Sequence, residues 1–357
     1  MSATQKALLL GAKQGTFSIS TIPIPQPGPG QLLLKIHAVA LNPVDWKVQV
    51  NGIIVTDYPA VLGTDISGTV EKLGVGVEDF EVGDKVCTQG YFHNEHAGFQ
   101  QYTLANADIT AKLPPNVSFE GAATLPVGLA TAALGLYTEN LPQNVDFGSA
   151  GLTPPWVAGG EQKYARKPIV VIGASSSVGQ CVVQLARLSG YSPIIATASL
   201  HNTDHLLSLG ATHVLSRNLN PAALQSSIKE ITTEPLDLIY DAISLPETQN
   251  LAYELLEPGG CLIIVLFPKI RIDPSTGGQK EKRVEKAFGQ VNFPPENRNA
   301  ARGLYKNLTK YLETGLIQPN RVEVLPGGLE GIVSGLDRLQ NDNVSGAKLV
   351  VRPQETA

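Results

Sequence analysis

The sequence has few cysteines and histidines, three and six in 357 residues. Cys87, Cys181 and Cys261 lie far apart, and an odd, scattered set of cysteines excludes the disulfide framework of a small secreted protein. There is no C-x2-C pair, whereas structural zinc sites are built from closely spaced cysteines. His93 and His96 are the one tempting metal pair, but they stand in a polar segment without the helical pattern of a metal motif. We therefore expect a protein of a reducing compartment, the cytoplasm, with no metal centre.

Strong charge and long apolar runs are also absent. Lys and Arg number 27 against 32 Asp and Glu, a net charge of −5 without a block of like charge. This balance disfavours nucleic acid and anionic membranes as partners. The longest apolar runs, 169–172 and 261–267, are far shorter than the about 20 residues of a membrane-spanning helix. The run 7–10 is too short for the core of a signal peptide. No Walker loop and no G-x-S-x-G elbow is present, which disfavours kinase and hydrolase chemistry.

Glycine and proline are abundant instead, at 35 and 25 residues, and hydrophobic residues make up 43% of the chain. This composition indicates a turn-rich folded protein, and the length indicates two domains. The first third reads as short strands between Pro and Gly turns. From Pro168 a pattern of strand, turn and helix repeats, which predicts an α/β fold with a doubly wound parallel sheet. Strands are expected at 169–172, 193–198, 214–215, 238–242 and 261–267, and helices at 130–137, 178–186, 203–209, 222–231 and 247–256.

The pattern changes near residue 125, and a polar insertion rich in Gly and Pro follows at 141–167. We predict the first part of a β-rich domain over residues 1–125 and a nucleotide-binding domain over 126–303. Residues 304–357 are expected to return to the first domain. That last part is predicted to contribute a helix from about Leu304 and strands at 322–325 and 348–351.

The segment 173–179 lies between a predicted strand and an amphipathic helix, where a dinucleotide site needs small residues and a helix N-terminus. The G-x-G-x-x-G pattern is degraded, since Ala174, Ser176 and Gly179 occupy its three glycine positions. A simple Gly/Ser connector is the alternative, but the strand–turn–helix setting favours nucleotide binding. The predicted phosphate-binding residues are Ala174, Ser175, Ser176, Ser177, Val178 and Gly179.

The end of the next strand indicates which cofactor is used. NAD sites place an Asp or Glu there for the ribose diol, but residues 195–202 contain no carboxylate. Ser199, His201 and Arg217 could instead receive a 2′-phosphate. The sequence therefore favours NADPH, although Arg217 could equally be a solvated loop charge.

Several motifs in order along the chain resemble the medium-chain dehydrogenase/reductase superfamily. Residues 42–47 are similar to the N-P-x-D motif of its zinc-free quinone and enoyl reductase branch, and 63–68 stand where zinc alcohol dehydrogenases have G-H-E. Residues 80–86 and 98–102 match its turn-plus-strand and G-x-F/x-x-Y stretches, and Leu125-Pro126 with Thr131-Ala132 matches the helix that enters the coenzyme domain. Within the branch, the segment 204–215, the insertion and Lys47 look most like fungal trans-acting enoyl reductases. The resemblance implies a GroES-like catalytic domain and a Rossmann coenzyme domain.

The resemblance also implies site residues. Asn42 and Thr64 stand in place of the zinc ligands Cys and His, which implies zinc-free chemistry. Lys47, Thr131 and Asn42 are the implied catalytic residues, with Lys47 as a cation near an acyl carbonyl or the cofactor phosphate, or else a surface lysine on a turn. Asp45 could be a general acid, with a cap of the following turn as the alternative. Asp65 could be a catalytic carboxylate, with a structurally paired, buried carboxylate as the alternative. Further implied cofactor contacts are Asn42, Pro43, Lys47, Thr131, Asp241, Val265, Leu266 and Phe267.

The implied activity is zinc-independent, NADPH-dependent reduction of a C=C bond conjugated to a carbonyl. The substrate would be an enone, an enoyl thioester or an acyl chain on a carrier, with a polyketide synthase as partner. A quinone reductase using the same site and a non-catalytic NADPH-binding protein are the alternatives. Monomer and homodimer both stay open, and so does the substrate, because loops at 52–57, 141–167 and 270–295 would shape its pocket.

Overall fold

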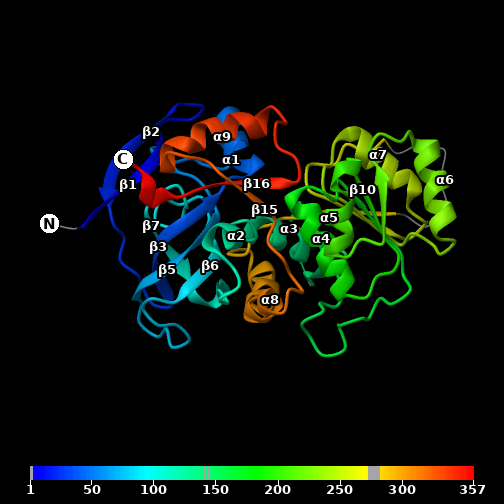
Figure 1. The fold of residues 1–357 in the computed structure, drawn as a ribbon, viewed down its shortest axis with the longest axis horizontal. Coiled ribbons are helices and arrows are strands. Elements are labelled where there is room, and N and C mark those ends of the chain that lie inside the picture. The colour runs from blue at the N-terminus through cyan, green and yellow to red at the C-terminus, as the bar shows by residue number, and fades with distance from the viewer. Residues whose placement is uncertain (1–2, 140, 143–144, 272–281) are drawn as a thin grey trace. The chain divides into compact units, whose positions relative to one another are not determined.

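The computed structural model describes residues 3–139, 141–142, 145–271 and 282–357 and divides into two compact units (Figure 1). Parts of the predicted insertion 141–167 and of the predicted loop 270–295 lie outside the described residues. The first unit comprises Met1–Val127, Tyr305–Gly315 and Pro319–Ala357, and the second comprises Gly128–Leu304 and Leu316–Gln318. Among the helices of the described residues, none is both long and apolar enough to cross a bilayer.

The first unit is built from short strands, as its Pro and Gly punctuation predicts. Its larger sheet has the order β15-β16-β3-β5-β6-β8, with β7 also paired to β3. These strands are β3 (Gln31–Ala40), β5 (Asp65–Leu73), β6 (Lys85–Gln89), β7 (Tyr102–Asn106), β8 (Thr110–Lys112), β15 (Arg321–Val324) and β16 (Ala347–Val351). A smaller sheet joins β2 (Phe17–Pro23), β1 (Thr4–Leu10) and β4 (Ala60–Val61). The two C-terminal strands thus complete the N-terminal sheet, with β16 antiparallel to β3.

Helices α1 (Pro43–Asn51), α2 (Phe119–Ala123) and α9 (Gly331–Gln340) also belong to this unit. The sequence pattern indicated only a turn at α1. A helix forms there because Pro43 stands at its first position, where a fixed φ and a missing N–H are tolerated, and because Gly52 ends it in the left-handed conformation. Helix α8 (Pro295–Glu313) starts well before the expected Leu304. The chain passes between the units within α8 and within α3 (Pro126–Tyr137).

The second unit contains a six-stranded parallel sheet in the order β11-β10-β9-β12-β13-β14. Its elements are β9 (Ile169–Ile172), α4 (Ser177–Leu188), β10 (Ile194–Ala198), α5 (Thr203–Leu209), β11 (His213–Ser216), α6 (Pro221–Ile231), β12 (Leu238–Asp241), α7 (Pro246–Leu255), β13 (Cys261–Ile264) and β14 (Arg283–Lys286). This order confirms the predicted doubly wound sheet. All strands are parallel, but successive strands are added on one side of β9 up to β11 and on the other side from β12 onward. The boundary between β9 and β12 is therefore the switch point of the sheet, and ligands of such sheets bind there, outside the carboxyl ends of the strands.

The core of the second unit explains why its strands lack alternation. Val170, Ile239 and Leu262 on neighbouring strands are fully buried and cluster with Leu224 and Ile228 of α6. The described part of the insertion contains no helix or strand. It is held against α3 by backbone hydrogen bonds that Ala150 and Leu152 donate to carbonyl groups of that helix. Most of the predicted site residues lie elsewhere, at the start of α1 and at the carboxyl edge of the parallel sheet.

Candidate functional site

The start of α1 brings three predicted residues together in the first unit. Asn42 precedes the helix in an extended conformation, and its N–H donates to Asp45 Oδ2 at 2.8 Å. Asp45 therefore caps the local structure, as one reading of the sequence proposed. Lys47 follows on the same helix, half-buried, with Nζ 5.6 Å from the centre of the Trp46 ring. Among the described residues, no carboxylate forms an ion pair with Lys47, and burial lowers the pKa of its ammonium.

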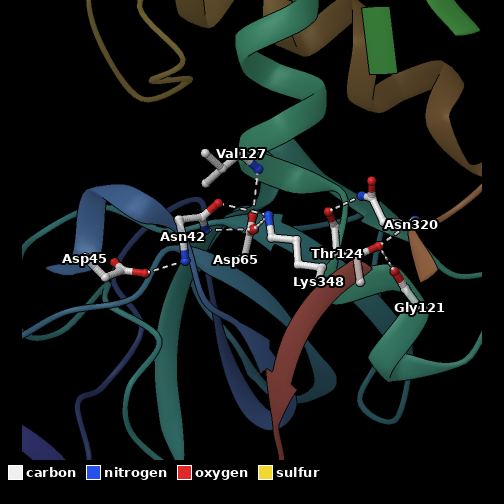
Figure 2. A network of polar contacts seen from close by, with 8 residues as sticks. All are labelled: Asn42, Asp45, Asp65, Gly121, Thr124, Val127, Asn320 and Lys348. Atoms are coloured by element: carbon white, nitrogen blue, oxygen red, sulfur yellow. Dashed lines mark hydrogen bonds and ion pairs between the residues drawn. The ribbon is translucent and has the colours of Figure 1, made fainter. Parts of the chain in front are cut away.

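A buried polar cluster joins Asn42 to the other end of the chain (Figure 2). Lys348 Nζ, on β16, donates to Asp65 Oδ2 and, at 2.9 Å, to Asn42 Oδ1. Asn42 Nδ2 donates to the same Asp65 oxygen at 2.9 Å, and Val127 N donates to Asp65 Oδ1 at 2.6 Å. Asp65 is thus the paired structural carboxylate that one reading of the sequence expected. The cluster holds one ammonium and one carboxylate out of water, with every member fixed by its neighbours.

These residues do not fit a catalytic zinc ion. Asn42 and Thr64 offer an amide and a hydroxyl where thiolate and imidazole would be needed. The nearby carboxylate of Asp65 already binds the Lys348 ammonium, which would repel a second cation. Within the described part of the chain, no group of three or more His, Cys, Asp and Glu could hold a metal ion.

The histidine pair set aside in the sequence belongs to a packed loop. His96 is buried, its Nδ1 lies 3.1 Å from Leu104 O, and its ring stacks on Tyr91 with centroids 4.4 Å apart. Burial lowers the pKa of His96 to about 4. These contacts give His96 a structural role in the first unit.

Asp45 lies close enough to the Lys348–Asp65–Asn42 cluster for the charge of Asp65 to affect the pKa of its carboxyl group. Burial, with a smaller contribution from the Asp65 charge, raises the pKa of Asp45 to about 7. Its Oδ2 accepts the Asn42 N–H, and its side chain is fully buried. A carboxyl group in this state is able to hold a proton near neutral pH.

The predicted phosphate turn follows β9 in the second unit. Gly173 has φ 71°, a conformation that glycine adopts without strain. Gly179 is packed so closely that a Cβ there would lie 2.4 Å from Gly173 O. Ser176 caps α4, with Oγ accepting the Gly179 N–H at 3.0 Å. The turn therefore combines close backbone packing with the N-terminus of a twelve-residue helix, as pyrophosphate binding requires.

The loop after β12 meets this turn at the switch point. A Cβ on Gly173 would lie 2.2 Å from Ile243 Cγ1, so the Ile243 side chain lies directly on the turn. Asp241, at the end of β12, accepts hydrogen bonds from Ile243 N, Ser244 N and the Thr248 hydroxyl. Burial raises the pKa of Asp241. Its carboxyl oxygens thus organise its own loop, and a direct contact with a cofactor stays a prediction.

Thr131 lies on α3 with 9% of its surface exposed. Its carbonyl accepts from the hydroxyl of Tyr240 at 2.9 Å, and a Cβ on Gly289 would lie 2.1 Å from its Oγ1. Tyr240 is fully buried in the core of the second unit. The hydrogen bond from Tyr240 and the absence of a side chain at Gly289 therefore both help to position Thr131.

The residues predicted to choose the cofactor surround the carboxyl end of β10. Ser199 follows this strand directly and is half-buried, while His201 and Arg217 are exposed. Arg217 lies beside the end of β10, because its backbone N–H donates a hydrogen bond to Ala198 O at 2.9 Å. No acidic side chain follows β10 until Asp204, in the first turn of α5.

The structure distributes the predicted site residues over the two units. Asn42, Pro43 and Lys47 lie at the start of α1 in the first unit, which also contains the candidate acids Asp45 and Asp65. The other predicted catalytic and cofactor-binding residues lie in the second unit. Sequence reasoning missed Lys348, Ser244 and Gln249, which connect the predicted residues. A lysine inside the apolar strand 347–351 was the one available signal, since a buried ammonium needs a counter-ion.

Comparison with known proteins adds a family to this geometry. Residues 28–115 match the family described as alcohol dehydrogenase GroES-like domain, and residues 177–300 match the one described as zinc-binding dehydrogenase. A trans-enoyl reductase of Pyricularia oryzae is 33% identical over 98% of both chains. A zinc-type alcohol dehydrogenase-like protein of Schizosaccharomyces pombe is 33% identical over 97% of this chain and 99% of its own.

Solved structures share the fold at lower identity. An alcohol dehydrogenase superfamily protein of Novosphingobium aromaticivorans superposes with a TM-score of 0.79 at 22% identity, covering 98% of this chain and 99% of its own. A quinone oxidoreductase of Pseudomonas syringae gives 0.74 at 19% identity, covering 98% and 100%. Together with the family matches, these likenesses confirm the predicted fold, a GroES-like domain and a Rossmann-type domain.

Proposed function

This chain belongs to the medium-chain dehydrogenase/reductase superfamily of oxidoreductases, and we propose that it is an NADPH-dependent, zinc-independent enoyl reductase. The observation that carries the proposal is the Lys348–Asp65–Asn42 cluster, in which Asn42 stands in place of a zinc ligand. It places an amide and a carboxylate-bound ammonium where a zinc ion would need its ligands. An enolate is intrinsically more stable than an alkoxide, so hydrogen-bond donors suffice for reduction of an activated C=C bond.

The dinucleotide turn supports the cofactor part of the proposal. The close contact of Gly179 with Gly173, the Ser176 cap and the N-terminus of α4 suit a pyrophosphate. Ser199, His201 and Arg217 suit a 2′-phosphate, since no carboxylate stands at the end of β10 to repel it. Residues 174–179 would hold the pyrophosphate, and the ends of β12 and β13, with Asp241 and Val265–Leu266–Phe267, would face the nicotinamide side.

The proposed chemistry divides between the cofactor and this chain. Bound NADPH would supply the hydride that adds to the β-carbon of the substrate. Lys47 has an ammonium without a carboxylate partner among the described residues, and burial lowers its pKa, which strengthens it as a hydrogen-bond donor. It is proposed to donate a hydrogen bond to the carbonyl oxygen while negative charge develops there and to keep its proton, so that the one proton added to the substrate goes to the α-carbon. Asn42 in the first unit and Thr131 in the second are each proposed to orient a bound reactant, and water would deliver the proton to the α-carbon.

The proposed substrate class is supported by relatives at about one-third identity over nearly the full length, which are named trans-enoyl reductases. We propose an enoyl thioester, carried as an acyl chain on the carrier domain of a polyketide synthase. Enones would be accepted as simpler analogues, because they contain the same conjugated carbonyl.

Three measurements test the function. Titration should show tighter binding of NADPH than of NADH, and NADPH absorbance should fall when an enoyl thioester is added. Loss of absorbance with a quinone but not with the thioester would make the protein a quinone reductase. Tight NADPH binding with no turnover of either acceptor would contradict both enzymes and indicate a binding protein.

A chelator separates the zinc-free chemistry from the alternative. Because Asp65 is already neutralised by Lys348, EDTA or phenanthroline should leave turnover unchanged. Loss of activity on chelation, with recovery on adding zinc, would overturn the zinc-independent mechanism.

A further inference from the structure

Two loops at the carboxyl edge of the parallel sheet are joined by buried side chains. These loops, residues 242–245 after β12 and 265–269 after β13, are called the strand-end loops below. They are connected through Ser244 within the first loop and Gln249 on α7. Both side chains are almost completely out of water, at 2% and 0% exposure.

Ser244 joins the ends of the two strands. Its Oγ donates to Asp241 O at 2.7 Å and accepts the N–H of Val265 at 2.8 Å. Its φ of 58° is left-handed, a conformation that non-glycine residues rarely adopt. Such residues persist where the surroundings fix them, and they are concentrated at functional sites.

Gln249 ties both loops to helix α7. Its Nε2 donates to Ser244 O at 2.7 Å and to Phe267 O at 3.1 Å, and its Oε1 accepts the N–H of Lys269 at 2.7 Å. Because Nε2 faces two carbonyl groups and Oε1 faces one N–H, only one of the two flipped orientations of the Gln249 side-chain amide satisfies all three hydrogen bonds. One side chain thus fixes backbone groups in both loops.

The strand-end loops lie on one side of the switch point between β9 and β12. Ile243 packs on Gly173 of the phosphate turn, and Ile243, Leu245 and Phe267 are 36%, 51% and 66% exposed. In a doubly wound sheet, the end of the second strand binds the adenosine ribose, and the pyrophosphate lies at the first helix. The second strand here is β10, so the other half of the dinucleotide lies over β12 and β13.

We propose that Gln249 and Ser244 are positioning residues for the nicotinamide half of the cofactor, and this rests on the proposed function. They act through the backbone of the strand-end loops, and neither needs to touch the cofactor. Their removal should weaken binding of the whole dinucleotide while leaving binding of its adenosine half unchanged.

The test compares two ligands on two matched variants. Gln249→Met removes the amide with little change in volume. Gln184→Met removes an equally buried glutamine of α4, whose side chain, among the described residues, bonds to the backbone of Gln318 and not to the strand-end loops. Dissociation constants are measured calorimetrically for NADPH and for 2′,5′-ADP, which contains the adenosine half alone.

For Gln249→Met we expect the NADPH constant to rise by about tenfold and the 2′,5′-ADP constant to stay within about twofold. Gln184→Met should leave both constants within about twofold. Ser244→Gly keeps the left-handed backbone accessible and removes the hydroxyl, so it should repeat the Gln249 pattern even if Gln249→Met does not fold.

Unchanged NADPH binding in Ser244→Gly or Gln249→Met would overturn the inference, and so would an equal loss for both ligands. A wild-type protein that binds neither ligand would instead contradict the proposed function itself. Preference for NADH would correct the proposed cofactor, and NADH with ADP would then replace the two ligands in the same comparison.

Discussion

The ammonium of Lys348 is paired with the carboxylate of Asp65 inside the first unit, with side-chain exposures of 4% and 0%. Asn42 completes the arrangement by accepting from the lysine and donating to the aspartate. A buried pair of this kind is sensitive to the loss of one partner, because the other is left as an uncompensated charge in a medium of low dielectric.

Lys348→Met should therefore destabilise the protein by about 3–5 kcal/mol. Asp65→Asn combined with Lys348→Met should lose less than the single lysine variant, since no unpaired charge remains. Urea unfolding of the wild type, both single variants and the double variant provides the thermodynamic cycle. A double variant that is less stable than Lys348→Met would show that the ion pair is not what holds this cluster.

The carboxyl group of Asp45 predicts a pH dependence of stability. Burial raises its pKa from an ordinary 3.8 to about 7. The folded state then binds the proton more tightly than the unfolded chain. Stability is full below about pH 4 and is lost as the pH rises to about 7, by about 4 kcal/mol in total.

Asp45→Asn should remove this dependence and keep the bond to Asn42 N, because an amide oxygen accepts the same hydrogen bond. Between pH 5 and pH 8 the wild type should lose about 3 kcal/mol more than the variant in the free energy of unfolding. Parallel pH profiles for the two proteins would mean that Asp45 ionises normally in the folded state.

How far the sequence predicts this molecule depends on the range of the interactions. Helix α5 was predicted to its last residue, because its period and the left-handed Gly210 that ends it are both local signals. The predicted strand–turn–helix setting of residues 173–179 is also a local signal and is confirmed, since they lie between the buried β9 and the amphipathic α4. Their binding of phosphate stays a prediction. The domain boundaries at 125/126 and 303/304 stay predictions.

The residues that were missed depend on distant parts of the chain. Lys348 bonds to Asn42 and Asp65 across 306 and 283 positions, and nothing near Lys348 in sequence indicates either partner. Gln249 is an ordinary helix residue until β13 brings Phe267 and Lys269 beside it. Local periodicity predicts elements, whereas such pairings appear only when the topology is known.

The contact between Gly289 and Thr131 gives a test of the proposed catalytic threonine. A Cβ at position 289 would lie 2.1 Å from Thr131 Oγ1, so Gly289→Ala must displace the hydroxyl. We expect both Gly289→Ala and Thr131→Ala to lower kcat by about tenfold. The double variant should lose little more, because the displaced group is already gone. Steady-state kinetics and melting temperatures are measured together, and additive losses in the double variant would separate Gly289 from Thr131.

The cofactor preference predicted from the end of β10 can be reversed by one charge. Ser199 directly follows this strand, at the place where a carboxylate would bind a ribose diol and repel a 2′-phosphate. Ser199→Glu should therefore weaken NADPH binding by about 100-fold and leave NADH binding unchanged or tighter. His213→Glu adds the same charge at the exposed amino end of β11, away from the carboxyl edge, and serves as the matched control. If the two variants weakened NADPH equally, the effect would be one of net charge, and Ser199 would not lie at the phosphate.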